Sequence, residues 1–525
     1  MKGGNELKKV GFVLLLVMVV ASLVISGGCA KPAPTPTPPA TESIKVGVLI
    51  SLTGFDAAVG QPAKNGYELA IAKINQDGGV YVKEFDKKIP LELVLLDMES
   101  NPEKAVARAE ALNSQYNVAI ATGTTLISAA AEIFEKNKMP VVVSQMTIDL
   151  LSQSGYRYWF TIGKLNSDVA VAVLDLFDSL NGNKPTKWAL LEEQFPFVVE
   201  LMDFVQQDAA ARGVNIVYRG QYATMAPDLS PLINDAKKAG AEVLFSGPNT
   251  PDAITIVKQS KELGFNPKAM ACIRGADDPG WSGLGPMGEY VIGCPDWHPA
   301  FKFPGVDELN AAYKAKYGTN THIAAGPCYA SIQLIADAIE RAGTLDREKL
   351  RDAIAASNTM TVMGQIKFRE NGARIDPVPS VIQWQNGELE LVWPDNLKTK
   401  SLVYPRPEPA SKPAPTGTQP ATPSTPLPSG PEIDWKDAKN HFNENVTVTG
   451  EIMDVRNFAP PEVVLFLGGG MGVGMGVAIK DGLNWPVDPD SYKGKTISVT
   501  GKITAAPIGG GPMIAVTDPA QIVVK

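Results

Sequence analysis

The sequence predicts an α/β body built on parallel sheets, followed by a small all-β barrel. Between residues 44 and 404, short apolar runs alternate with segments of helical periodicity. Between residues 433 and 525 only short β-rich runs recur. A proline-rich segment at 405–432 separates the two patterns and predicts a flexible linker. Because 525 residues are too many for one hydrophobic core, several domains are expected.

Residues 1–28 have the layout of a secretory signal peptide. Lysines precede an apolar run from Val10 to Ile25, and small residues then lead to Cys29. This run is shorter than the roughly 20 residues that a membrane-spanning helix needs. The arrangement resembles the lipobox of prokaryotic lipoproteins, which implies that Cys29 becomes the lipidated first residue of the mature chain.

The lipobox usually has an aliphatic residue three positions before its cysteine, whereas this chain has Ser26 there. A plain cleaved signal or an uncleaved anchor therefore stays open beside lipidation of Cys29. All three interpretations place the following domains outside the cytoplasm. The Pro-, Ala- and Thr-rich stretch that follows cannot bury a core, so 29–43 are expected to form a semi-rigid tether.

Composition argues against several classes of protein. The chain has 48 Lys and Arg against 56 Asp and Glu, and this net charge of -8 makes nucleic acid an unlikely main partner. The three histidines lie far apart, without metal-ligand spacing. Four cysteines are too few for a disulfide scaffold. Cys272 and Cys294 could pair while Cys328 stays free, or all three could be buried thiols.

The body begins with a buried strand pattern at 44–52, followed by apolar residues at helical spacing. A second strand pattern at 91–97 precedes Asn101, which can cap a helix that starts at Pro102. The series continues with seven strand patterns separated by helices: "VAIAT", "PVVVSQ", "KWALLE", "NIVYRG", "EVLFSG", "KAMACI" and "EYVIGC". Such repeats give parallel sheets covered by helices, which bind ligands at the carboxyl ends of their strands.

Segment 46–79, which reads "VGVLISLTGFDAAVGQPAKNGYELAIAKINQDGG", is followed by "LDMESNPEKAV". Together they resemble the start of type I periplasmic solute-binding proteins of the leucine/isoleucine/valine group, and "PCYASIQLIADAIERAG" at 327–343 is similar to a later part. The resemblance covers 44–404. It implies two α/β lobes joined by crossovers, with lobe one at about 44–164 plus 299–375. It also implies that a small ligand, an amino acid or a related carboxylate or amide, binds between the lobes and passes to an ABC permease.

In lobe one, Gly123, Thr124 and Thr125 follow a strand and precede a helix. Backbone N–H groups and two hydroxyls at a helix N-terminus form a seat for a carboxylate. The alternative is that the threonines only cap the helix. The resemblance implies that Gln145 and Thr147, which follow the next strand, also reach the cleft.

The second lobe departs from the family pattern. The family commonly has an aromatic residue followed by glycine where this chain has Phe197 and Val198. Asn249 stands at a position often held by tyrosine, whereas Tyr329 matches the family. The resemblance implies that Phe197, Asn249 and Tyr329 contact the ligand, although Phe197 could instead belong to the core.

Arg274 lies near the position where an acidic residue of the family would hold the ammonium group of an amino acid. If Arg274 faces the ligand, its bidentate guanidinium favours a second carboxylate or another anionic group. Alternatively, Arg274 pairs on the surface with Asp277 or Asp278.

Enzyme motifs are incomplete. "GWSGLG" at 280–285 looks like a nucleophile elbow, but Leu284 replaces the required glycine two positions after Ser282. The glycine-rich segment 468–476 lacks the Gly-Lys-Ser/Thr ending of a P-loop and the dinucleotide-binding spacing. We therefore expect a binding protein rather than an enzyme, with no catalytic residues, cofactor or metal.

The tail at 433–525 has five strand-like runs after a helix pattern, "DWKDAKNHF". It resembles OB-fold domains, in which strands ending in Val-Thr-Gly recur, as at 448–450 and 499–501. OB-folds often bind oligonucleotides or oligosaccharides. Because the tail has few aromatics and its lysines are scattered among acids, nucleic-acid binding is disfavoured. Contact with a glycan or another protein, or a passive accessory role, stays open.

These patterns together predict a membrane-anchored receptor outside the cytoplasm that supplies an ABC permease. The alternative is a surface-anchored ligand sensor or adhesion protein that acts through the OB-like tail. Neighbouring permease and ATPase genes would favour transport.

Overall fold

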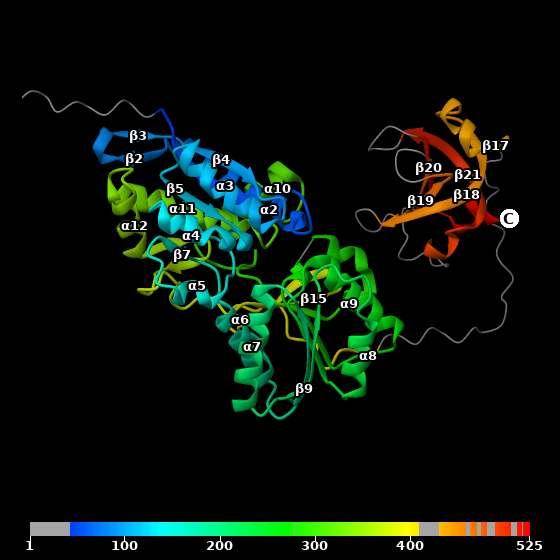
Figure 1. The fold of residues 1–525 in the computed structure, drawn as a ribbon, viewed down its shortest axis with the longest axis horizontal. Coiled ribbons are helices and arrows are strands. Elements are labelled where there is room, and N and C mark those ends of the chain that lie inside the picture. Colours follow the sequence, from blue (N-terminus) through cyan, green and yellow to red (C-terminus); the bar gives the residue numbers. More distant parts are fainter. Residues whose placement is uncertain are drawn as a thin grey trace, which may run out of the picture.

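The computed structural model describes residues 42–277, 279–408, 430–457, 463–469, 474–479, 489–505, 512–516 and 518–525. The expected signal peptide, Cys29, nearly all of the tether and most of the linker lie outside the described residues. Two α/β lobes and a small β-barrel make up the described chain (Figure 1). Within the described ranges, no helix combines the length and apolarity that crossing a membrane requires.

Lobe one is built on a five-stranded parallel sheet in the order β4-β1-β5-β6-β7. Val46 of β1 lies between Leu93 of β4 and Ile120 of β5, so β1 is an interior strand. Its nearly continuous apolar sequence suits a parallel strand that helices cover on both faces. The strands are β1 (Ile44–Ile50), β4 (Leu91–Asp97), β5 (Ile120–Gly123), β6 (Val141–Val143) and β7 (Trp159–Thr161).

Two groups of helices cover the faces of this sheet. On one face, α2 and α11 cross so closely that a Cβ on Gly66 would lie 2.3 Å from the carbonyl oxygen of Ala325. On the other face, the predicted cap Asn101 of α3 accepts hydrogen bonds from two backbone N–H groups, which confirms the helix start. The helices of lobe one are α2 (Ala57–Gln76), α3 (Pro102–Ser114), α4 (Ala131–Lys136), α5 (Asp149–Gln153), α10 (Val306–Tyr317), α11 (Ala325–Ala342) and α12 (Arg347–Ala355). Two hairpins complete it: β2 (Val80–Val82) with β3 (Lys87–Ile89), and β13 (Thr359–Thr361) with β14 (Gly364–Ile366).

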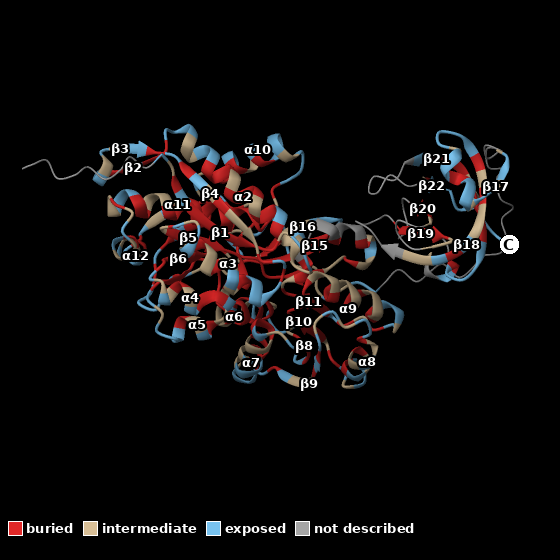
Figure 2. Ribbon diagram, turned by 45° about the horizontal axis from the view of Figure 1, so that its top comes forward, coloured by how far each residue is buried: buried red, intermediate tan, exposed pale blue. Residues whose placement is uncertain are grey.

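Lobe two is built on a seven-stranded sheet in the order β16-β15-β12-β11-β10-β8-β9. The five strands predicted from sequence are parallel, whereas β15 and β16 form an antiparallel edge that the sequence patterns did not single out. The strands are β8 (Lys187–Glu193), β9 (Asn215–Tyr222), β10 (Val243–Ser246), β11 (Ala269–Cys272), β12 (Val291–Gly293), β15 (Val381–Gln385) and β16 (Glu388–Trp393). The helices are α6 (Asn166–Asp178), α7 (Pro196–Ala211), α8 (Ser230–Lys238) and α9 (Thr250–Glu262). Figure 2 shows both sheets buried beneath helices whose outer faces are exposed.

The chain passes between the lobes three times, at 162–165, 294–305 and 367–380. Lobe one therefore contains 44–161 and 306–366, and lobe two contains 166–293 and 381–393. This division agrees with the one that the family resemblance implies.

The tail forms a closed five-stranded barrel in the order β18-β19-β20-β22-β21, closed by pairing of β18 with β21. The glycines of the two Val-Thr-Gly motifs allow neighbouring side chains to pack against the backbone, where a Cβ atom would collide with them. A Cβ on Gly450 would lie 2.6 Å from the Trp435 ring, and one on Gly501 would lie 2.6 Å from Ile514. The strands of the tail are β17 (Glu432–Asp434), β18 (Asn445–Asn457), β19 (Val463–Leu467), β20 (Met475–Ile479), β21 (Thr496–Ala505), β22 (Pro512–Val516) and β23 (Ile522–Val524).

The structure refines two expectations about the tail and its linker. The leading helix is only a short 3-10 helix, η5 (Trp435–Asn440). The first residues of the expected linker lie on lobe two, because the Arg406 N–H donates to the Lys268 carbonyl (2.7 Å) and Asn266 donates to the Pro407 carbonyl (3.2 Å). Composition alone could not reveal these long-range hydrogen bonds.

Candidate ligand site

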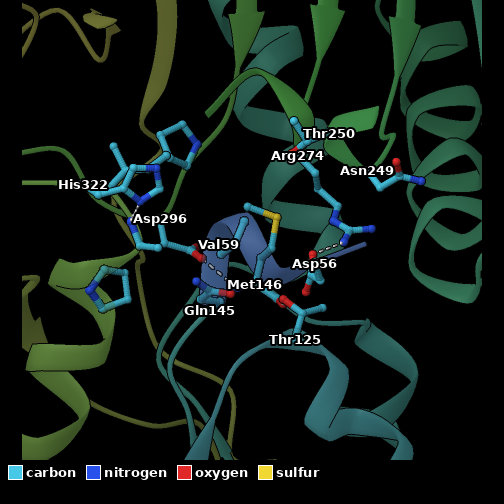
Figure 3. A pocket seen from close by; sticks show the side chains of 14 residues that line it. Asp56, Val59, Thr125, Gln145, Met146, Asn249, Thr250, Arg274, Asp296 and His322 are labelled. Atoms are coloured by element: carbon cyan, nitrogen blue, oxygen red, sulfur yellow. Dashed lines mark hydrogen bonds and ion pairs between the residues drawn. The ribbon is translucent and has the colours of Figure 1, made fainter. Parts of the chain in front are cut away.

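A cavity of about 50 Å³ lies between the lobes and has room for only a few water molecules (Figure 3). Most of its residues follow the carboxyl ends of strands in both sheets, as expected for parallel α/β architecture, and those between His322 and Pro327 lie at the start of α11 (Ala325–Ala342). Lobe one contributes Asp56, Val59, Thr125, Gln145, Met146, His322, Ile323, Ala324 and Pro327; lobe two contributes Asn249, Thr250 and Arg274; and one crossover contributes Pro295 and Asp296.

An ion pair between Arg274 and Asp56 bridges the two lobes across this cavity. The Arg274 Nη2 atom lies 3.5 Å from the Asp56 Oδ1 atom, and the side chains are only 11% and 13% exposed. Figure 3 shows the guanidinium reaching from the loop after β11 toward the N-terminus of α2. Arg274 therefore faces the cavity. The side chains of Asp277 and Asp278, its alternative partners, lie outside the described residues.

Two aromatic rings support the guanidinium of Arg274. Its Cζ atom lies 5.3 Å from the ring centre of Phe195 and 5.4 Å from that of Phe197, within the range of cation–π attraction. Phe197 is buried in the core of lobe two and does not line the cavity. It acts on the site through Arg274, because the ring limits the orientation of the planar cation.

The surroundings of Asp56 shift the pKa of its carboxyl in opposite directions. Burial raises the pKa of the Asp56 carboxyl; Arg274 opposes this shift, and the nearby Glu193 carboxylate adds to it. A cationic group placed beside Asp56 would favour the ionised carboxylate in the same way that Arg274 does.

Asn249 lines the cavity, but its side chain is engaged in capping helix α9. The amide oxygen accepts from the Asp252 N–H (3.0 Å), and the amide nitrogen donates to Glu193 (3.1 Å) and Asp252 (2.8 Å). In Figure 3 the amide points away from Asp56. Asn249 therefore shapes the wall of the cavity, and its amide has little remaining capacity for a ligand.

On the lobe-one side, Thr125 and Gln145 line the cavity. The Thr125 hydroxyl donates to the Met146 carbonyl (3.0 Å), so it can accept a further hydrogen bond but must turn before it can donate one. Gln145 is half-buried, and among the described residues its side-chain amide has no hydrogen-bond partner. Gln145 is therefore the side chain in this wall that is most available to a ligand.

Three other expected ligand contacts do not line the cavity. Thr124 is buried, its N–H donates to the Leu49 carbonyl, and its side chain makes no capping hydrogen bond to the short helix η2 (Thr125–Ala130). Thr147 is buried beside the first crossover. Tyr329 lies in the core of lobe one, where burial raises the pKa of its hydroxyl.

A buried polar cluster joins the three crossovers. The Lys164 ammonium donates to the carbonyl of Pro295 (2.5 Å) and to the hydroxyl of Ser380 (3.1 Å). The Asp296 carboxylate accepts from the Lys164 and Met146 backbone N–H groups, each at 2.7 Å. Burial raises the pKa of Asp296, and Lys164 opposes that shift. The cluster ties the crossovers to one another directly beside the cavity.

Sequence reasoning missed Asp56, Met146, Asp296 and His322 as lining residues. Asp56 had a usable signal, because it lies just beyond the carboxyl end of β1 within the segment that carries the family resemblance. Asp296 had no such signal in the sequence, because its role depends on hydrogen bonds from Lys164 and Met146, which are distant in sequence. Cys272, Cys294 and Cys328 are all free and buried, so the first two do not form a disulfide.

The profile of the periplasmic binding protein family matches residues 43–388. The chain belongs to this family. The family consists of solute-binding proteins and not of enzymes.

Individual relatives agree with this assignment. The Leu/Ile/Val-binding protein homolog 7 of Brucella suis biovar 1 (strain 1330) is 25% identical over 70% of this chain and 96% of its own length. A leucine-binding protein of Thermotoga maritima MSB8 shares the fold with a TM-score of 0.60 and 24% identity, over 67% of this chain and 100% of that protein. The branched-chain amino acid transporter substrate-binding protein of Streptococcus pneumoniae was solved with isoleucine. Its TM-score is 0.57 and its identity 19%, over 67% of this chain and 100% of that protein.

Proposed function

We propose that this protein is the extracytoplasmic receptor of an ABC transporter. It captures an amino acid, or a related carboxylate or amide, between its lobes and delivers it to the permease. In this proposal 1–28 form the signal peptide, Cys29 carries a lipid anchor, and the following residues to 43 tether the receptor to the membrane. The receptor occupies 44–404, the linker 405–432 and the OB-like domain 433–525.

The Arg274–Asp56 pair is the observation from which we infer the class of ligand. The head group of an amino acid has a carboxylate and an ammonium group a few ångströms apart, and this pair offers the complementary charges across the cavity. The direct contact uses one guanidinium N–H group at a long distance, which leaves further donors for a carboxylate. Asp56 would accept hydrogen bonds from the ammonium group, and Gln145 would add a polar contact from lobe one.

Ligand entry requires the lobes to separate, because a cavity of about 50 Å³ cannot hold an amino acid. An entering ligand would replace the direct Arg274–Asp56 contact with one contact to each lobe. Since both lobes would then hold the ligand, binding would favour a closed arrangement that the permease can recognise. The Lys164–Asp296 cluster would serve as the fixed pivot for this movement.

A ligand screen tests the proposal. The purified protein would be heated with aliphatic amino acids, their amides, dicarboxylates and small aromatic acids. A true ligand at about 100 times its dissociation constant should stabilise the fold by roughly 2.7 kcal/mol. Arg274→Met should then weaken binding at least tenfold by calorimetry, since it removes a charged hydrogen bond.

Arg212→Met provides a matched control, because Arg212 is also a lobe-two arginine but pairs with Asp175 and Asp178 away from the cavity. The Arg212→Met variant should bind the ligand with the same affinity as the unchanged protein. Equal affinity in the Arg274 and Arg212 variants would refute the assignment of Arg274. Failure of every ligand class would count against transport of such solutes.

Anchoring and delivery have tests of their own. The intact mass of protein extracted from membranes should include a lipid group that Cys29→Ser removes. Liganded receptor should stimulate ATP hydrolysis by its permease in proteoliposomes more strongly than unliganded receptor. Absence of the lipid mass would favour a plain cleaved signal.

A further inference from the structure

We propose that lobe two carries a second ligand site that takes a small carboxylic acid with an apolar body. A cavity of about 520 Å³ lies between helix α9, the segment leading to β12 and the chain at 406–408. It is about ten times larger than the interlobe cavity and falls within the usual range of ligand pockets. The site is separate from the cleft, so the inference does not rest on the proposed transport function.

The walls of this cavity are mostly apolar. Val257 and Phe265 come from α9 and the turn that follows it, and Met270 comes from β11; their exposed fractions are 3%, 8% and 1%. Met287 and Tyr290, from the segment that leads to β12, also line the cavity. A hydrocarbon chain or an aromatic ring placed here would leave water for an apolar surface that is already formed.

Arg406 supplies a cation to the cavity. Its backbone is held by the hydrogen bond to Lys268, and its Nη1 atom lies 3.9 Å from the sulfur of Met270. Its Nε–H group is buried and has no hydrogen-bond partner among the described residues. Burial lowers the pKa of the Arg406 guanidinium, and the nearby Cys272 acts in the opposite direction by raising it.

No carboxylate among the described residues forms an ion pair with this guanidinium. Glu289 and Glu408 both line the cavity. The two oxygens of Glu289 accept hydrogen bonds from the backbone N–H groups of Asn386 and Gly387, and Glu408 makes no ion pair with Arg406. The Cys272 thiol is not a counterion, because burial raises its pKa to about 12. Arg406 is partly buried, and its Nε–H group is fully buried. A partly desolvated cation without an ion-pair partner is costly, and a carboxylate ligand would offset that cost.

A second unsatisfied polar group lines the same cavity. Ser260 of α9 is 1% exposed, and its hydroxyl has no hydrogen-bond partner among the described residues. A carboxylate in the cavity could accept a hydrogen bond from the Arg406 guanidinium, and Ser260 could donate a second one after its side chain turns toward the cavity. Tyr290 has a φ of 62°, a left-handed backbone that is uncommon for a bulky residue, and such strain often accompanies binding sites.

Calorimetry of the full protein tests the site with decanoate and 4-phenylbutyrate as probes. The neutral decanamide and 4-phenylbutyramide serve as uncharged counterparts. We expect saturable binding of both acids, at least tenfold weaker in Arg406→Met and about threefold weaker in Ser260→Ala. The amides should bind weakly and equally to all variants.

Arg274→Met distinguishes this site from the interlobe cavity, because it should leave the binding of these acids unchanged. Acid binding that is lost in Arg274→Met but kept in Arg406→Met would place the probes in the cleft and overturn the inference. Absence of acid binding at about 1 mM, or equal binding of acids and amides, would also overturn it.

The stability of the unliganded protein provides a second readout. Because Arg406 lacks an ion-pair partner, Arg406→Met should keep or raise the melting temperature. A clear fall would mean that Arg406 is a structural residue, and would contradict its role as a ligand-binding cation.

Discussion

Replacing Lys164 by Met tests whether the polar cluster holds the three crossovers together. Lys164 is 1% exposed, and its ammonium group donates to Pro295 and Ser380. Methionine has a similar length but no donor. The change therefore leaves the carbonyl of Pro295 and the carboxylate of Asp296 buried without the nearby positive charge.

The expected fall in melting temperature follows from the free energy lost and the number of residues in the two lobes. Removing the Lys164 ammonium leaves its buried acceptors without a donor and takes away the positive charge near Asp296, and the loss of such a buried charge costs about 3–5 kcal/mol. The two lobes comprise roughly 360 residues, and at about 2.1 cal/mol/K per residue their unfolding entropy is about 0.76 kcal/mol/K. If the lobes unfold together, the melting temperature should fall by about 4–7 °C.

Calorimetric melting at pH 7 measures this shift, and Lys316→Met is the control. Lys316 pairs with Glu68 at 3.2 Å, but its side chain is 47% exposed, so its loss should cost less than about 1 kcal/mol. Equal melting temperatures for the Lys164 and Lys316 variants would refute the role given to the buried cluster.

Three further predictions concern the cleft, pH and packing. Asp56→Asn should weaken binding of amino acids about tenfold or more but spare acids that lack an ammonium group, as calorimetry would show; equal losses would exclude a contact between Asp56 and the ammonium. Burial lowers the pKa of His298, so its contribution to stability is present above about pH 6.5 and is lost as the pH falls below that value. Denaturant titrations should show a smaller loss between pH 7 and 5 for His298→Asn. Gly66→Ala should cost about 1–3 kcal/mol in the same assay, because the new methyl group would meet the Ala325 backbone, and an unchanged midpoint would contradict the close helix crossing.

Local periodicity was sufficient to predict most strands and helices. The predicted strands of lobe one and the parallel strands of lobe two occur where the apolar runs indicated, because each run must be buried on both faces of a sheet. The antiparallel strands β15 and β16 were missed. They return to lobe two only after the chain has crossed lobe one, and no local pattern records that path.

The candidate site was partly predictable. Thr125, Gln145, Asn249 and Arg274 were expected at the ends of strands, and all four line the cavity. Tyr329 was expected there too but lies in the core, because the resemblance could not give the direction in which α11 presents it.

The sequence by itself determined the α/β repeats, the linker composition and the strand ends at which a ligand site could form, since these depend on neighbouring residues. Tertiary structure alone decided that Arg274 faces Asp56, which is 218 positions away. It also decided that the Asn249 amide is used in capping α9, and that the partly buried Arg406 has no ion-pair partner among the described residues. The physical reason is that charge pairing and desolvation depend on the distances that folding creates between distant segments.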